Sequence, residues 1–520
     1  MALLLPVTER RQLTRAKIAP PDLAERYRRE IRHALEKNHR SALGQFLTPP
    51  HVSRLMASMP TNVPETVDLL DPGAGVGALV AAFVTDILSR PERPRRIRAC
   101  CIEIEPTFIP RLRRVLRACE DECHKHGVDF QSRVEQVDFI DAAVDHLMGR
   151  DLFASRSFPR FTHAILNPPY KKLHAESRER QTLRLAGVET SNYYTAFLWL
   201  SSLLLESGGE IVSITPRSFC NGPYFKPFRM DFLTMMSLRR LHVFESRSAA
   251  FVHDDVLQEN VIVHAVKGCP APSSVRISSS TGEPGGETHL RRVAYRDVVF
   301  PENPQRFIHL ESDNAQPRAK RMMRCLTTSL DELGVSVSTG RVVDFRAKAF
   351  LRRSPGSDTA PLIYPCHFNG GFIHWPKENT RKPNAIFIDD HTRELLVTSG
   401  IYLLVKRFTT KEERRRIVAC IYDSQRIEAA LVGFENHLNY FHRQDRGLSM
   451  ILAKGLAAFL NSTIVDLYFR QFSGHTQVNA TDLRALRYPQ RIKLERLGGE
   501  IDDPGMSQEA LDMLVESELF

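Results

Sequence analysis

Short apolar runs alternate with longer amphipathic stretches through the first half of the chain. Five of the apolar runs predict buried β-strands, at residues 67–71, 97–104, 133–137, 163–166 and 209–214. Apolar residues at helical spacing predict the helices between them, at residues 78–88, 108–123 and 192–205. Strands that alternate with helices are typical of a doubly wound parallel sheet, which binds ligands at the carboxyl ends of its strands. The sequence therefore predicts an α/β domain with a Rossmann-like sheet, which residues 243–244 and 254–262 would complete.

The regions outside this domain differ in composition. Residues 1–40 carry ten Lys or Arg and five Asp or Glu, with Leu23, Tyr27, Ile31 and Leu35 at helical spacing. We interpret them as a basic helix that packs on the next domain, in preference to a nucleic-acid contact. Residues 270–287 are rich in Ser, Pro and Gly and read as a linker, and residues 500–520 contain seven acidic and no basic residues. The predicted domains are 1–40, 41–268, 269–490 (a mixed α+β domain) and an acidic tail, 491–520.

The composition is typical of a globular protein with an excess of positive charge. The 520 residues are 42% hydrophobic and 25% charged, and the formal net charge is +10, which favours a polyanionic partner. No apolar run reaches the length of about 18 residues that a membrane helix needs, so we expect a cytoplasmic protein without membrane contact. We also expect a monomer. Cys119, Cys123, His124 and His126 superficially resemble a zinc cluster. They lack a second ligand pair at structural spacing, so we expect no metal.

A glycine-rich loop follows the first predicted strand. Asp71 and Pro72 lead into Gly73, Gly75 and Gly77, and the helix begins directly afterwards. Glycine lets the backbone pass close to a ligand where a Cβ would collide. Between a strand and a helix, this spacing indicates a nucleoside-type cofactor.

Polar or aromatic residues follow the next strands as well. Glu103 and Ile104 end the second strand, where a carboxylate can bind both ribose hydroxyls, with Glu105 as the alternative acid. Asp138 and Phe139, after the third strand, suit the edge and face of an amino-purine.

The fourth strand runs into a stiff turn, Asn167-Pro168-Pro169-Tyr170. Two prolines fix the backbone, so the Asn167 amide and the Pro168 carbonyl are held as acceptors. Two such acceptors could receive the hydrogens of an exocyclic amino group while its nitrogen attacks a methyl group. Taken alone, an ordinary Pro-Pro loop fits equally well.

With these motifs in this order, residues 44–488 resemble the S-adenosylmethionine-dependent DNA adenine-N6 methyltransferases of type II restriction-modification systems. The resemblance implies that Asn167, Pro168, Pro169 and Tyr170 hold the target base. It implies that the cofactor is bound by Gln45, Phe46, Thr48, Pro49, Asp71, Pro72, Gly73, Gly75, Gly77, Glu103, Ile104, Asp138 and Phe139. A second ring against the flipped base is expected from Phe225, with Tyr224 as the alternative.

The resemblance also assigns the second half of the chain to DNA target recognition. It implies double-stranded DNA as the substrate, with a restriction endonuclease encoded separately. Basic residues at 406–416 suit phosphates, and the Asn- and Gln-rich segments 435–442 and 472–484 suit base edges. Methylation of RNA or of a protein glutamine, or an inactive DNA-binding module, are the alternatives.

Overall fold

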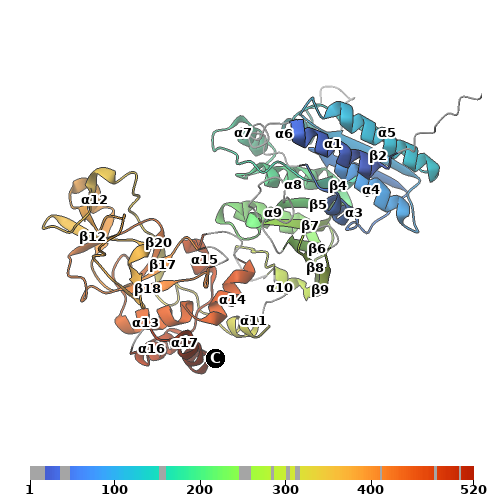
Figure 1. Cartoon of the computed structure of the whole chain (residues 1–520). Coiled ribbons are helices and arrows are strands. Elements are labelled where there is room, and N and C mark those ends of the chain that lie inside the picture. The colour runs from blue at the N-terminus through green and yellow to red at the C-terminus, as the bar shows by residue number, and fades with distance from the viewer. Residues whose placement is uncertain are drawn as a thin grey trace, which may run out of the picture. The chain divides into compact units, whose positions relative to one another are not determined.

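The protein has two compact units (Figure 1). Unit 1 comprises Met1–Phe219 and Tyr224–Tyr295, and unit 2 comprises Cys220–Pro223 and Arg296–Phe520. A computed structural model describes residues 18–34, 47–150, 160–244, 259–282, 286–299, 305–310, 317–409, 413–472, 477–502 and 505–520.

A nine-stranded mixed sheet organises unit 1, in the order β3-β2-β1-β4-β5-β7-β6-β8-β9. The first five strands in this order run parallel to their neighbours, whereas β7 is antiparallel to both β5 and β6. The strands are β1 Thr66–Pro72, β2 Arg96–Ile102, β3 Asp129–Glu135, β4 Phe161–Leu166, β5 Leu205–Pro216, β6 Met236–Phe244, β7 Asn260–Lys267, β8 Ser274–Ser280 and β9 Thr288–Ala294.

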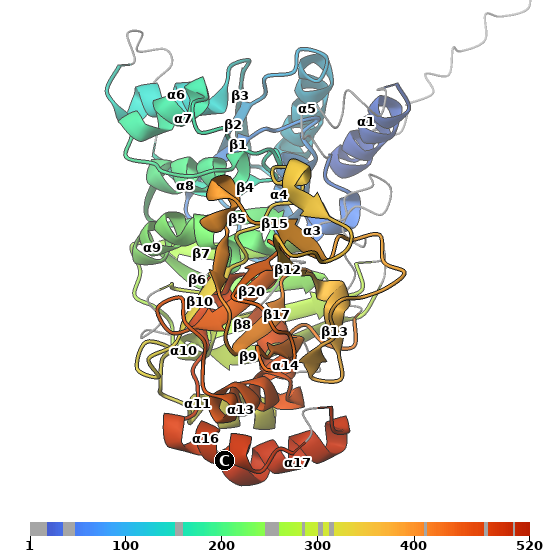
Figure 2. The ribbon, with the colours of Figure 1, turned by 90° about the vertical axis from the view of Figure 1, so that its left-hand side faces the viewer.

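Helices cover both faces of this sheet. Helices α1, α4 and α5 pack on one another on one face, and α6, α7 and α8 lie on the other (Figures 1 and 2). Strand β4 is buried along its whole length, as expected for a strand covered on both sides. The helices of unit 1 are α1 Pro20–Ala34, α3 Pro50–Ala57, α4 Ala78–Ser89, α5 Ile109–Lys125, α6 Phe139–Leu147, α7 Arg178–Leu185, α8 Tyr193–Leu204 and α9 Lys226–Met235.

The predicted α/β architecture is confirmed, with differences at the edges of the sheet. The sheet is parallel only from β3 to β5 and is mixed beyond it. Strand β3 begins at Asp129, earlier than predicted, because backbone pairing with β2 extends over its polar residues. The apolar residues of a strand do not reveal backbone pairing that extends over its polar residues.

Unit 1 includes two segments that the sequence predicts to lie outside the 41–268 domain. Helix α1 buries Ala24, Tyr27 and Ile31 in the core of this unit. Strands β8 and β9 extend the sheet beyond residue 268, and the contacts divide the chain at residue 295 instead. Within the Ser-rich segment read as a linker, Val275 and Ile277 are buried at alternate positions, which is the pattern of a strand.

A buried polar network crosses the amino-terminal side of the sheet. Glu210 on β5 accepts hydrogen bonds from the Thr61 amide at 2.7 Å, the Thr61 hydroxyl at 2.9 Å and His264 Nε2 at 3.0 Å. Burial raises the pKa of Glu210, but the hydrogen bonds and the neighbouring histidines outweigh it and lower the pKa to about 2. His163 on β4 donates from Nε2 to the Asn62 carbonyl at 3.1 Å. The network therefore fixes the loop before β1 to two strands.

Unit 2 contains two smaller sheets, of six and five strands, in the orders β10-β20-β17-β18-β14-β13 and β11-β15-β12-β19-β16. Their strands are β10 Ser336–Thr339, β11 Leu351–Arg352, β12 Thr359–Ile363, β13 Phe368–Asn369, β14 Phe372–Ile373, β15 Ala385–Phe387, β16 Leu396–Thr398, β17 Tyr402–Lys406, β18 Ala419–Tyr422, β19 Leu431–Phe434 and β20 Leu438–His442.

Helices pack against the six-stranded sheet at one end of unit 2 (Figure 2). They are α11 Pro317–Arg324, α13 Met450–Leu460, α14 Thr463–Phe472, α15 Ala480–Ala485, α16 Arg491–Gly499 and α17 Gln508–Leu519, while α10 Tyr295–Val298 and α12 Asp390–Arg393 are single turns. A Cβ on Gly455 would lie 1.9 Å from the Leu494 carbonyl oxygen, so α13 and α16 approach backbone to backbone. Leu511, Val515 and Leu519 of α17 join the same core. The carboxyl-terminal segment is therefore integral to this unit.

In the part of the chain that the structure describes, no single helix is long and apolar enough to cross a membrane. Helices α13 and α14 meet the length and composition test only as a pair bent by 55°.

Replacing His163 tests the buried network. Burial lowers the pKa of His163 from 6.5 to about 4. As the pH falls through this interval the unfolded chain binds a proton that the folded protein excludes, so stability is lost. We expect the free energy of unfolding of the wild type to fall by about 3 kcal/mol more than that of His163→Gln over this interval, as measured by urea unfolding. The exposed His124→Gln should behave as the wild type, and a difference that is independent of pH would contradict the assignment.

Candidate functional site

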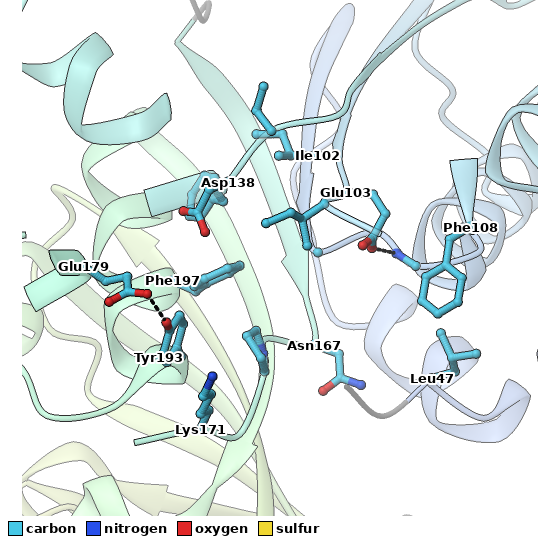
Figure 3. A pocket seen from close by; sticks show the side chains of 16 residues that line it. Leu47, Ile102, Glu103, Phe108, Asp138, Asn167, Lys171, Glu179, Tyr193 and Phe197 are labelled. Carbon is cyan, nitrogen blue, oxygen red and sulfur yellow. Dashed lines mark hydrogen bonds between the residues drawn. The ribbon is translucent and has the colours of Figure 1, made fainter. Parts of the chain in front are cut away.

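A cavity of about 250 Å³ opens where β1, β2, β3 and β4 end (Figure 3). Each of these strands contributes lining residues within a few positions of its carboxyl end, because parallel pairing brings these ends to one edge of the sheet. The lining residues are Leu47, Gly73, Gly75, Ile102, Glu103, Ile104, Phe108, Val137, Asp138, Phe139, Asn167, Pro169, Lys171, Glu179, Tyr193 and Phe197.

The glycine-rich turn forms one wall of this cavity. Gly73, Gly75 and Gly77 all have positive φ, at 77°, 55° and 85°. A Cβ on Gly75 would lie 2.9 Å from Leu47 Cδ2, so a side chain there would intrude on the wall. Gly77 instead faces Leu112 and Val115 of α5, where a Cβ would again be too close. The first two glycines therefore keep space open at the cavity, and Gly77 allows the turn to pack closely against α5.

Glu103 joins the glycine-rich turn to the end of β2. Its side chain is only 2% exposed, and its carboxylate accepts hydrogen bonds from the Gly75 amide at 2.7 Å and the Glu105 amide at 2.8 Å. Burial raises the pKa of Glu103 and these amides act against the rise. The Ile104 amide also acts on this carboxylate, and a carboxylate has about four acceptor positions, so capacity remains for a ligand hydroxyl. Ile104, the next residue, is 51% exposed and also lines the cavity.

Asp71 is a buried carboxyl at the end of β1, just before the glycines. Neither of its oxygens has a hydrogen-bond partner among the described residues. Burial raises its pKa well above the ordinary value, and the nearby Glu103 raises it further. A buried acceptor without a partner is costly in the free protein. Asp71 does not line the cavity itself, and neither does Pro72, which is also buried.

The Asn-Pro-Pro-Tyr turn closes the cavity at the end of β4. Asn167 Nδ2 donates to Thr48 Oγ1 at 3.1 Å, which fixes the orientation of the amide. Pro169 lines the cavity, whereas Pro168 is buried behind it. The Tyr170 hydroxyl donates to the Ile214 carbonyl at 3.3 Å, and burial raises its pKa. The predicted turn is therefore held from both sides.

Thr48 and Pro49 contact the site through this turn and through α3, which begins at Pro50. Gln45 and Phe46, predicted in the same segment, lie outside the described residues.

Asp138 and Phe139 both line the cavity, and Figure 3 shows Asp138 apart from Asn167. Asp138 caps α6, because its Oδ1 accepts from the Ile140 amide at 2.7 Å and the Asp141 amide at 3.2 Å. The ring of Phe139 packs on Phe197 at 4.8 Å between centroids. Asp138 therefore has a local structural role, and its carboxylate still borders the cavity.

The sequence does not predict several of the lining residues. Phe108 and Phe197 contribute aromatic walls from segments that the sequence marks only as helical. Tyr193 donates to Glu179 Oε1 at 2.9 Å, and Lys171 Nζ lies 5.8 Å from the Tyr193 ring centroid. Lys171 directly follows the Asn-Pro-Pro-Tyr motif, and this position is the only one among these residues that could have predicted a place in the cavity wall.

Neither candidate for a second base-stacking ring lines this cavity. Phe225 is buried and packs on Tyr194, with 5.7 Å between ring centroids. Tyr194 in turn meets the Tyr170 ring edge-on at 6.3 Å. Tyr224 is 80% exposed. Phe225 thus supports the turn through Tyr194.

No group of three or more potential metal ligands occurs in the described ranges. Cys119 and Cys123 are buried in the core of unit 1.

Comparisons with known proteins show the family to which the chain belongs. The family model described as Eco57I restriction-modification methylase matches residues 116–251. The type II methyltransferase M.PstI of Providencia stuartii is 42% identical over 497 residues, covering 96% of this chain and 97% of that protein. The type II methyltransferase M.BsuBI of Bacillus subtilis is 43% identical over 461 residues, covering 88% and 90%. In fold, the chain resembles the DrdV protein of a DrdV–DNA complex, with a TM-score of 0.51, 11% identity and coverage of 92% of this chain and 59% of that one.

Because more than 40% of its residues are identical to those of two methyltransferases over nearly the whole chain, the protein is a methyltransferase. It belongs to the Eco57I restriction-modification methylase family, among the type II methyltransferases.

Asp71→Asn tests the unpartnered carboxyl. The raised pKa of Asp71 means that the folded protein holds a proton that the unfolded chain releases, so stability is lost as the pH rises above 3.8. The amide does not ionise, so we expect Asp71→Asn to be more stable than the ligand-free wild type by at least about 1 kcal/mol at pH 8. Urea unfolding at pH 5 and pH 8 should show a gain that grows with pH.

Asp68→Asn, on the same strand, is the matched control. Asp68 is paired with Arg98 at 2.5 Å, so this change should lower stability. A loss of stability in Asp71→Asn as well would show that Asp71 has a partner in the free protein.

Proposed function

We propose that the protein transfers a methyl group from S-adenosylmethionine to N6 of adenine in a specific duplex DNA sequence, as the modification enzyme of a restriction-modification system. The observation that carries this proposal is that the Asn167 turn and the Gly73–Gly75 turn line one cavity. An amino group held at the first would meet a donor held at the second. Membership in a family of restriction-modification methylases supports DNA as the substrate.

The lining residues fit S-adenosylmethionine. Phe108 and Phe197 provide apolar faces for an adenine ring, and Glu103 retains acceptor capacity for a ribose hydroxyl. The absence of a Cβ at Gly75 leaves room beside Leu47. The buried, unpartnered Asp71 carboxyl beside the turn suits a cationic ligand. When bound, this cofactor supplies an electrophilic methyl group on a sulfonium.

Asn167 has the role of orienting the target amine. Its Nδ2 donates to Thr48, which orients the amide, and in this proposal its carbonyl oxygen is the acceptor for the target amine. An amine hydrogen accepted by this oxygen, and a second accepted by the Pro168 carbonyl, hold the nitrogen lone pair toward the methyl group. A base within the duplex cannot reach this position, so the adenine must leave the stack. Proximity then provides much of the acceleration, and the amine loses its proton during or after attack.

Unit 2 has the role of target recognition in this proposal. It contains 225 residues in Arg296–Phe520, and its short strands are connected by exposed loops. A restriction endonuclease of the same specificity would be a separate chain.

Asn167→Ala tests the proposed catalytic role. We expect the rate of methyl transfer to unmethylated DNA to fall at least about a thousandfold, because the acceptor that orients the amine is lost. Cofactor affinity, measured by isothermal titration calorimetry, should stay within about threefold of the wild type, since the glycine turn and Glu103 are untouched. The exposed Asn62→Ala is the control and should retain full activity.

The two measurements separate the possible failures. Retained methyl transfer in Asn167→Ala would refute the role of this turn. A wild-type protein that binds no S-adenosylmethionine would instead indicate an inactive DNA-binding module.

A further inference from the structure

Phe345 is a large aromatic side chain that unit 2 leaves in solvent. It is 76% exposed, the highest value for a large apolar side chain in the described part of this unit. Single exposed apolar residues are common on proteins and need no explanation by themselves. The surroundings of Phe345 are what distinguish it.

The turn that carries Phe345 is held firmly. Asp344 accepts hydrogen bonds from the Tyr364 hydroxyl and from Lys382 Nζ, both at 2.7 Å. The amides of Arg346 and Ala347 both donate to the Val343 carbonyl at 3.0 Å. Ala347 is buried, so the chain is anchored on both sides of the ring. The exposure of Phe345 is therefore a fixed property of the turn.

The charges around Phe345 are almost all positive. Residues 341–353 contain five Lys or Arg and a single acid, Asp344. The Arg346 guanidinium lies 5.6 Å from the Phe345 ring centroid. Arg346, Lys348 and Arg353 have no acidic partner among the described residues.

A second basic loop is attached to the first. Asn384 Nδ2 donates to the Arg353 carbonyl at 3.2 Å and to the Lys377 carbonyl at 3.0 Å. Together with the Asp344–Lys382 pair, this side chain joins residues 341–353 to residues 377–382. The second segment adds three basic residues, Lys377, Arg381 and Lys382, and one acid, Glu378. We call these two segments the basic loop pair.

We propose that the basic loop pair binds duplex DNA, with the Phe345 ring stacking on a base and with Arg346 and Lys348 binding phosphates beside it. The inference rests on the proposed DNA substrate and assigns the residues that meet it. In a duplex the face of a base becomes accessible where a neighbour leaves the stack, as base flipping requires, and an inserted aromatic ring finds there the apolar contact that it lacks in water. Phosphates complement the unpaired cations. A second copy of this chain would bring the same cations against one another, so charge favours DNA over self-association.

The salt dependence of DNA binding distinguishes the two roles. The affinity of the full chain is measured by fluorescence anisotropy, at several salt concentrations, with a labelled duplex that contains the methylated sequence as identified by sequencing. Stacking releases no counterion, so Phe345→Ala should weaken binding about tenfold at every salt concentration and leave the slope of log K against log salt unchanged. Arg346→Gln removes a phosphate contact, so it should reduce that slope by about one.

Ile492→Ala is the matched control. Ile492 is 73% exposed on α16 of the same unit and lies outside the basic loop pair, so its loss should leave DNA affinity unchanged. Phe345→Trp keeps an aromatic face and should keep the affinity within about twofold of the wild type. Equal thermal stability of the variants excludes unfolding as the cause of any loss.

Affinity of Phe345→Ala within twofold of the wild type would overturn the inference, and so would a changed slope in that variant. If the wild-type protein methylates DNA while Phe345→Ala binds normally, only this inference fails. If the wild type neither binds nor methylates duplex DNA, the proposed function fails and the inference fails with it.

Discussion

The parallel pairing of β1 with both β2 and β4 is the constraint on which the site depends. It brings three strand ends to one edge of the sheet, so the glycine turn, Glu103 and Asn167 lie around one cavity despite their distance in sequence. The hydrogen bond from the Gly75 amide to Glu103 fixes the first two to each other. The bond from Asn167 to Thr48 fixes the third to the segment before α3. Burial of β1 and β4 on both faces keeps this edge from shifting.

One residue next to the site lowers the stability of the free protein. Asp71 is a buried carboxyl group whose charge is disfavoured by burial and by the nearby Glu103, and it has no hydrogen-bond partner in the described chain. Stability of the free protein is lost through such a group. A ligand that brings positive charge or hydrogen-bond donors to this edge would restore the lost stability. Ligand binding and the stability of the protein are therefore linked at these residues.

The sequence predicts those parts of the site that have a local signal. Glycines at alternate positions after an apolar run, an acid at the next strand end and the Asn-Pro-Pro-Tyr turn are all visible within short windows. Phe108, Phe197 and Tyr193 could not be predicted as lining residues, because their positions depend on how helices pack over the sheet. Phe225, predicted from the resemblance to stack on a base, packs on Tyr194, and no short sequence window reveals that contact. Its stacking on a base stays a prediction. The Ser-rich segment was read as a linker because composition outweighed the alternation of Val275 and Ile277.

The most direct test of the account is to identify the atom that is methylated. Unmethylated plasmid DNA would be incubated with the full-length protein and S-adenosylmethionine carrying a deuterated methyl group, digested to nucleosides and measured by mass spectrometry. The account predicts deuterated N6-methyladenine, in amounts that match a limited number of sites per plasmid. Label on cytosine, or label transferred to RNA or protein and none to DNA, would contradict it.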